Sequence, residues 1–132
     1  HSPAVLTDIY ELEFDVDGAY NITGGGDAIK IFGTVLAIVR DFIKHVQPNA
    51  IIFDAKDESR NKLYARMTKR ICSSGGYVNA TAELDERIKK EVPPVGAKAP
   101  ILDQLTYFYK RYRDNTLDGY ETTILVKNSV LK

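Results

Sequence analysis

The sequence has no tryptophan, one cysteine, one methionine and no net charge. A single cysteine cannot form an internal disulfide, and no group of residues has the spacing of a zinc site. No apolar run approaches the roughly 18 residues that a membrane-spanning helix needs, and no secretory signal is visible. The 18 basic and 18 acidic residues create no overall field that favours nucleic acid or an anionic membrane. We therefore expect a cytoplasmic protein without a metal, a membrane or nucleic acid as its partner.

The composition that remains is that of an ordinary globular domain. The chain has 132 residues, of which 44% are apolar and 27% charged, enough for one hydrophobic core. No internal repeat or low-complexity tract is present. We expect one domain over residues 1–132, of the α/β (α+β) class, with residues 80–115 as a helical insertion.

Residues 10–16 alternate between apolar and acidic side chains. A period of two predicts a half-buried strand. The turn signal Asp17-Gly18 can return the chain through residues 19–22 as a hairpin partner. The acidic face either holds a general base or a cation, or is the solvated side of a sheet. Its members are Glu11, Glu13 and Asp15.

Residues 21–26 read Asn-Ile-Thr-Gly-Gly-Gly, and a helical pattern runs from Asp27 to Val46 before Pro48. Its apolar stripe is wide, so we expect this helix to be largely buried. Glycines allow the backbone to approach a ligand closely, and the free amides at a helix start attract phosphate. The alternative for the same residues is a tight turn from strand to helix.

The remaining elements follow from period and from turn signals. A continuous apolar run at residues 50–55 predicts a buried strand parallel to an earlier one. Asp57 or Ser59 starts a helix that ends near Ser73, with Leu63, Met67 and Ile71 on its inner face. Further on we expect an extended piece at Tyr77, helices at 82–92 and 101–113, and a closing strand at 120–127.

This order of elements resembles the acetyl-CoA-binding half of GNAT-type N-acetyltransferases. That family has a Gln/Arg-x-x-Gly-x-Gly/Ala pattern, which Asn21-x-x-Gly24-x-Gly26 matches at both glycines. It later has Leu-Tyr and then Gly-Phe, for which Leu63-Tyr64 and Gly76-Tyr77 stand here. The resemblance covers residues 10–78 and the closing strand. It implies a GNAT-like mixed sheet with a long central helix packed on it.

The resemblance also implies a ligand and a reaction. The cofactor is acetyl-CoA, with its pyrophosphate held by residues of the loop and the helix start: Asn21, Gly24, Gly25, Gly26 and Asp27. Glu13 or Asp15 accepts the proton of the attacking amine, and Tyr64 protonates the leaving thiolate. The alternative for Tyr64 is an aromatic residue of the core.

A second hypothesis is a reduced, non-catalytic relative. The family has further strands and helices before its central hairpin, whereas few residues precede Tyr10 here. The run Glu-Ser-Arg-x-Lys-Leu-Tyr also resembles small bacteriophage proteins, which implies an interaction or inhibitor protein in the host cytoplasm. Whether the chain is an enzyme therefore stays open.

Two surfaces are candidates for partners. Aromatic and arginine side chains, which are enriched at interfaces, cluster at Tyr107, Tyr109, Arg111 and Tyr112. The alternative is an amphipathic helix with basic ends. The basic residues between Arg60 and Arg70 indicate nucleic-acid binding as a third and last hypothesis.

Overall fold

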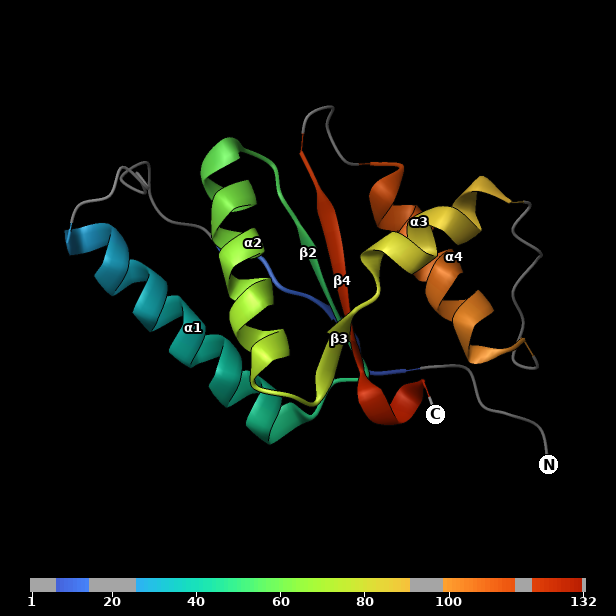
Figure 1. The fold of residues 1–132 in the computed structure, drawn as a ribbon, viewed down its shortest axis with the longest axis horizontal. Coiled ribbons are helices and arrows are strands. Elements are labelled where there is room, and N and C mark those ends of the chain that lie inside the picture. The colour runs from blue at the N-terminus through green and yellow to red at the C-terminus, as the bar shows by residue number, and fades with distance from the viewer. Residues whose placement is uncertain (1–6, 15–25, 91–98, 116–119, 132) are drawn as a thin grey trace.

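The protein is a layered α+β domain. The computed structural model describes residues 7–14, 26–90, 99–115 and 120–131, and the elements within these ranges form a mixed sheet between two pairs of helices (Figure 1). In chain order they are β1 (Ile9–Glu11), α1 (Gly26–Val46), β2 (Ala50–Asp54), α2 (Glu58–Ser73), β3 (Tyr77–Asn79), α3 (Thr81–Lys89), α4 (Ile101–Arg113), β4 (Thr122–Lys127) and a 3-10 turn (Asn128–Val130).

The sheet has four strands in the order β1-β2-β4-β3. β1 pairs with β2 in parallel, and β4 lies between β2 and β3 and is antiparallel to both. The three strands β1, β2 and β3 therefore run in the same direction, and their carboxyl ends point toward the same end of the sheet, where β2 extends furthest. β2 is the central element, since all five of its residues are buried.

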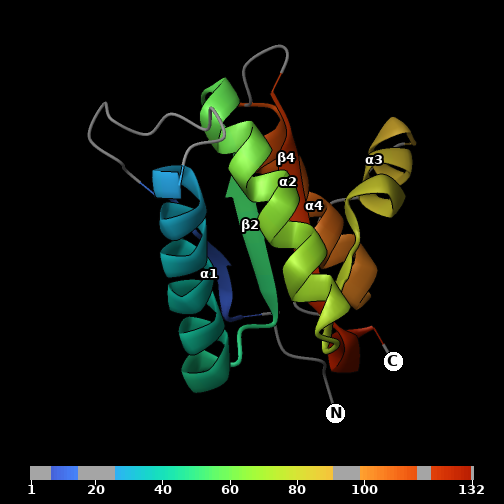
Figure 2. The ribbon, with the colours of Figure 1, turned by 60° about the vertical axis from the view of Figure 1, so that its left-hand side comes forward.

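Helices α1 and α2 cover one face of the sheet, as Figure 2 shows. Asp57 begins α2, because its side chain accepts the backbone N–H of Arg60 at 2.8 Å. The inner side of α2 then repeats at helical spacing and packs on Phe53 of β2 and Leu125 of β4. The buried residues of α2 are Leu63, Tyr64, Met67, Thr68 and Ile71.

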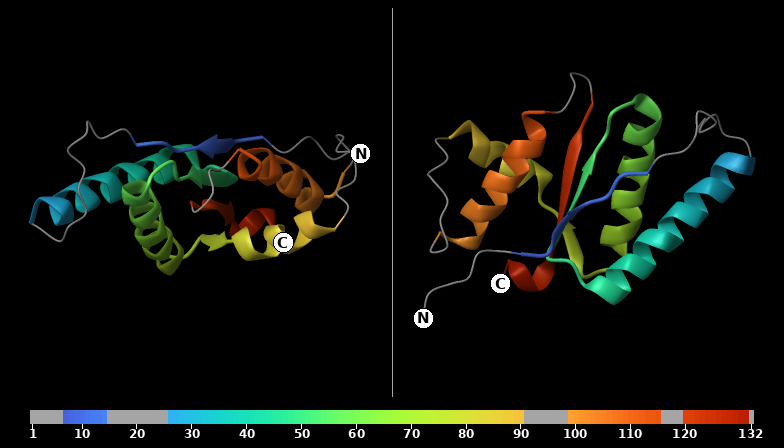
Figure 3. Two further views of the ribbon diagram at one scale, coloured as in Figure 1. Left: turned by 90° about the horizontal axis from the view of Figure 1, so that it is seen from above. Right: turned by 180° about the vertical axis from the view of Figure 1, so that it is seen from behind.

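Helices α3 and α4 cover the opposite face (Figure 3). Leu84 of α3 and Leu105 and Tyr109 of α4 are fully buried against Ile52 and Ile124 of the sheet. An ion pair between Arg87 and Asp103 connects the two helices. This pair of helices therefore covers the second of the two clusters that form the hydrophobic core.

Most of the predicted elements are confirmed, including the parallel strand after α1 and the inner face of α2. The predicted burial of the long helix α1 is wrong. Among the described side chains only Val35, Leu36 and Val39 are buried, and Ile38 is 54% exposed. The reason is position, since α1 packs with one side on α2 and on Tyr10 of β1, and the rest of its surface stays uncovered.

The first strand is shorter than its alternating pattern predicts. β1 ends at Glu11, although the apolar–acidic alternation continues through Leu12, Glu13 and Phe14. Residues 15–22, which include Val16 and the predicted hairpin partner, lie outside the described residues. A period of two indicates that side chains along an extended chain are buried alternately. It does not show at which residue the strand stops pairing with the neighbouring strand.

Candidate functional site

β1 and β2 separate at the carboxyl end of the sheet. The N–H of Leu12 still donates to the carbonyl oxygen of Ile52 at 3.0 Å. Two residues later the backbone of Phe14 is bound by α2 instead: its N–H donates to Tyr64 Oη at 3.3 Å, and its carbonyl accepts from Arg60 Nε at 2.7 Å. β2 meanwhile continues with β4 as far as Asp54. The two parallel strands thus diverge beyond Leu12, and we call this point of divergence, beside Glu13, the opening.

Glu13 lies at this opening. Its side chain is about half exposed and forms an ion pair with Lys56 at 3.1 Å, just after the end of β2. The hydrogen bond to Glu13 raises the pKa of Lys56 and so stabilises its charged form. The predicted general base is therefore accessible to a ligand, with a cation beside it that the sequence did not single out.

Tyr64 is close to Glu13 but lies inside the protein. Only 2% of it is exposed, and its ring centroid is 5.1 Å from that of Phe53 and 6.4 Å from that of Phe14. Burial raises the pKa of the Tyr64 hydroxyl, which is therefore protonated at neutral pH. These contacts agree with the alternative of a core aromatic residue that holds the chain at Phe14.

Two further carboxylates lie at the same edge. Asp54 is buried, and its Oδ1 accepts the Thr122 hydroxyl at 3.1 Å. Burial raises the pKa of the Glu11 carboxyl, and the nearby charges of Asp54 and Glu13 raise it further. Within the described ranges, no group of three or more His, Cys, Asp or Glu residues could hold a metal ion.

The predicted phosphate-binding residues are placed only in part. Gly26 and Asp27 are the first residues of α1. Asp15, Asn21, Gly24 and Gly25 lie outside the described residues. α1 begins after β1 and ends before β2, and its first turn lies at the far left of Figure 1, well away from β1 and β2.

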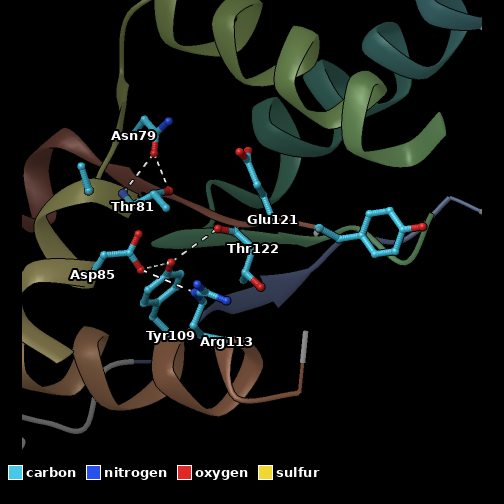
Figure 4. A pocket seen from close by; sticks show the side chains of 9 residues that line it. Asn79, Thr81, Asp85, Tyr109, Arg113, Glu121 and Thr122 are labelled. Atoms are coloured by element: carbon cyan, nitrogen blue, oxygen red, sulfur yellow. Dashed lines mark hydrogen bonds and ion pairs between the residues drawn. The ribbon is translucent and has the colours of Figure 1, made fainter. Parts of the chain in front are cut away.

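A pocket of about 350 Å³ lies further along this edge, between α3, α4 and the start of β4 (Figure 4). On its wall the hydroxyl of Tyr109 donates to Asp85 Oδ1 at 2.6 Å, and Arg113 Nε lies 3.8 Å from the same oxygen. Burial, together with the bond to Asp85, raises the pKa of Tyr109 far above its ordinary value. The residues that line the pocket are Asn79, Thr81, Ala82, Asp85, Tyr109, Arg113, Tyr120, Glu121 and Thr122.

Only some residues of the predicted aromatic interface on α4 lie at the surface. Tyr109 is fully buried, so its place in that interface is wrong. Tyr107 is 42% exposed, and the guanidinium carbon of Arg111 lies 6.0 Å from the centre of its ring. Beside them is a groove of about 260 Å³ lined by Ile9, Phe108, Arg111, Tyr112 and Asn115.

The basic stripe of α2 is not a uniform cationic surface. Arg60 binds Asp57 and the carbonyl of Phe14, and Lys62 pairs with Glu58 at 3.5 Å. The guanidinium carbon of Arg66 lies 4.9 Å from the ring centre of Phe32. These contacts give several of the charges an intramolecular role, which weakens the nucleic-acid hypothesis.

Sequence reasoning missed the pocket and the residues that give it charge. Asp85 and Tyr109 are 24 positions apart and lie on different helices, α3 and α4. Their chain segments carry no shared motif. Only the packing of α3 and α4 against the start of β4 brings them together, so no signal in the sequence indicates this site.

None of the described helices is both long and apolar enough to cross a membrane. No curated protein and no solved structure shows significant similarity to the chain. Residues 5–75, just over half of the chain, match a family of unknown function (DUF6934). The matched part contains β1, α1, β2 and α2, and hence both Glu13 and Tyr64. By this match the chain belongs to that family.

Proposed function

We propose that the protein binds an acyl-CoA of the acetyl-CoA type at the opening between β1 and β2 and transfers the acyl group to an amine. The observation that carries the proposal is the parallel β1–β2 pair, joined through α1, whose hydrogen bonding stops at Leu12 while β2 continues to Asp54. Open α/β sheets bind ligands outside the carboxyl ends of their strands. The arrangement supports a GNAT-like fold, since the order of strand, long helix, strand and Tyr64-bearing helix is the one in which the resemblance lies.

Glu13 is the residue to which we assign the chemistry. The amine nitrogen attacks the thioester carbonyl, so a carbon–nitrogen bond forms, the carbon–sulfur bond breaks and the amine loses a proton. Glu13 accepts that proton directly or through a water molecule, because its carboxylate is accessible at the strand end. The CoA thiolate leaves and takes a proton from solvent water.

Tyr64 has a positioning role in this proposal. Its hydroxyl accepts the N–H of Phe14, and Arg60 holds the carbonyl of the same residue, so the two side chains fix the chain that follows Glu13. The general-acid role remains a prediction for the variant Tyr64→Phe to decide.

Binding of acetyl-CoA is the first measurement. Titration calorimetry is expected to show saturable heat with a Kd below about 1 mM. Removing the cation at the opening in Lys56→Gln is expected to weaken binding about fivefold, since CoA is an anion and an exposed ion pair contributes little more. The matched control is Lys89→Gln, which removes an exposed lysine paired with Glu86 on α3 and is expected to leave the Kd unchanged. Absence of heat at millimolar CoA would contradict the proposal.

A second candidate function is protein binding through the exposed side of α4. The observation that favours it is the pair of Tyr107 and Arg111 next to the groove, with Phe108 at 5.8 Å from the Tyr107 ring. Within the part of the chain that the structure describes, no carboxylate pairs with Arg111, whereas Lys110 pairs with Asp114 and Arg113 with Asp85. The partner is then a protein surface with an acidic side chain that faces Arg111.

This candidate predicts that the double variant Tyr107→Ala/Arg111→Ala loses a partner that the wild type retains. Proteins retained from a bacterial lysate are identified by mass spectrometry, and the purified partner is then titrated against both forms. A loss of at least tenfold in affinity is expected if these residues are central to the interface. Ile38→Ala on α1 is the control, since it removes another exposed apolar side chain. Equal affinity of the partner for the double variant and the wild type would argue against an interface on α4.

A further inference from the structure

We infer that two copies of this chain associate through β1, in an antiparallel pair that places Glu11 of each copy beside Arg111 of the other. β1 is an edge strand, because the sheet has the order β1-β2-β4-β3. The left panel of Figure 3 shows it at the outer margin of the described elements. The backbone groups along a free edge can pair with a strand of another molecule.

The outer side of β1 carries free backbone groups at alternate residues. The N–H of Leu12 donates to the carbonyl oxygen of Ile52 at 3.0 Å, so the backbone groups of Leu12 face β2. Successive residues of a strand direct these groups to opposite sides, so those of Tyr10 also face β2 and those of Ile9 and Glu11 face outward. Within the described ranges, no strand pairs with this outer side.

A second copy of β1 in antiparallel orientation satisfies these outward groups. With the two Tyr10 residues opposite each other, Ile9 of each copy lies opposite Glu11 of the other. Each of these Ile9–Glu11 pairs exchanges two backbone hydrogen bonds, as hydrogen-bonded pairs of antiparallel strands do. The arrangement has two-fold symmetry, the commonest symmetry of homo-oligomers.

This register brings opposite charges together on the α4 side of the sheet. Residues that lie opposite each other in antiparallel strands have their side chains on the same face. Glu11 of the second copy therefore points to the same face as Ile9. On that face Ile9 and Arg111 line the groove of about 260 Å³ beside α4. The Glu11 carboxylate of each copy thus lies beside the Arg111 guanidinium of the other.

Within the described residues, Glu11 and Arg111 both lack an ion-pair partner. Glu11 is exposed and unpaired there, whereas Glu13 two residues later pairs with Lys56. Partial burial, and then the neighbouring carboxylates, raise the pKa of Glu11, so a cation beside it is favourable. The guanidinium carbon of Arg111 lies 6.0 Å from the ring centre of Tyr107, and its planar fork of donors suits a carboxylate. The symmetric interface gives both charges a partner.

The α1 side of the same strand pair is aromatic. Tyr10 alternates with its neighbours, so its side chain points to the other face of the sheet. There its ring centroid lies 5.3 Å from that of Phe42 on α1. The two Tyr10 side chains occupy a non-hydrogen-bonded position, at which opposite side chains are closest. Aromatic pairs at such positions stabilise the pairing of strands.

The inference does not depend on acyl transfer. It rests on the second candidate function in that both assign Arg111 to a protein contact, and it names a second copy of the chain as the partner. The two can fail separately. A chain that stays monomeric but still retains a lysate protein through Arg111 contradicts the second copy and leaves the second candidate function in place.

Self-association of the complete chain is the first test. Sedimentation velocity is expected to show a monomer–dimer equilibrium with a Kd below about 100 µM. Glu11→Arg and Arg111→Glu each place like charges together and are each expected to weaken association at least about tenfold. Both residues are exposed, so both variants are expected to fold normally. The control Glu86→Arg makes the same change at an exposed carboxylate of α3 and is expected to leave the Kd unchanged.

Mixing the two variants tests the pairing itself. In a mixed dimer each contact again joins a carboxylate and a guanidinium, so an equimolar mixture of Glu11→Arg and Arg111→Glu is expected to associate about as tightly as the wild type. A wild type that is monomeric at about 500 µM, or variants that associate as the control does, would overturn the inference. A mixture that associates no more tightly than its components would do so as well.

Amide hydrogen exchange locates the interface in the wild type without any substitution. The N–H groups of Ile9 and Glu11 are expected to exchange at least about tenfold more slowly at a protein concentration well above the Kd than at one well below it. Those of Tyr10 and Leu12 already face β2 and are the internal control. Equal exchange of the Ile9 and Glu11 amides at both concentrations would exclude pairing through β1.

Discussion

Replacing Tyr64 by alanine is expected to lower the free energy of unfolding by about 3–5 kcal/mol, the range for a buried aromatic side chain. The ring is buried and packs on Phe53, and its loss also frees the N–H of Phe14. Urea unfolding followed by circular dichroism measures the change. The matched control is Tyr107→Ala, the same substitution at an exposed position, for which we expect a change within about 0.5 kcal/mol.

The milder variant Tyr64→Phe separates the two roles of this residue. It keeps the ring and removes only the hydroxyl, so a loss of about 1 kcal/mol in stability is expected. If Tyr64 only positions the chain, acyl transfer by Tyr64→Phe stays within a few-fold of the wild type. A loss of about a hundredfold in turnover with the fold intact would restore the general-acid role.

Replacing Leu105 by alanine is expected to destabilise the protein by about 2–5 kcal/mol. Leu105 lies in α4, is fully buried and packs in the same cluster as Ile52 and Ile124. The physical reason is that α3 and α4 cover a complete face of the sheet, so a cavity beneath α4 weakens the central strands. Leu131→Ala, at an exposed leucine, is the control and is expected to change stability little.

Amide hydrogen exchange extends this prediction to the role of residues 80–115. If the segment is part of the cooperative core, exchange in Leu105→Ala rises in β2 and β4 as well as in α3 and α4. Faster exchange confined to α3 and α4 would show instead that the segment is an appendage on a core that folds without it.

Family membership and structure bear on different parts of the chain. The match to the family of unknown function ends at residue 75, whereas the pocket between α3, α4 and the start of β4 is lined by residues that lie between Asn79 and Thr122. The opening at Glu13 is therefore within the matched part of the chain, and the pocket is outside it. The acetyl-CoA titration therefore tests only the site at Glu13.

Within the described residues, the sequence by itself determined the order, type and approximate bounds of the helices and most strands. Leu63, Met67 and Ile71 predict the inner face of α2 because a helix of 3.6 residues per turn places them on one side. The continuous apolar run of β2 likewise predicts a strand buried on both faces. Glu13 was also predictable as an accessible carboxylate, since it alternates with apolar neighbours.

Only the tertiary structure decided which of those elements contact one another. It packed Tyr64 against Phe14, left most of the apolar stripe of α1 incompletely buried and moved Tyr109 from a predicted surface into the core. It also brought Asp85 of α3 and Arg113 of α4 together on the wall of one pocket. Periodicity is a property of neighbouring residues, so it shows which side of an element is apolar. Which partner covers that side depends on contacts between residues far apart in the chain, and these follow from the packing of the whole sheet.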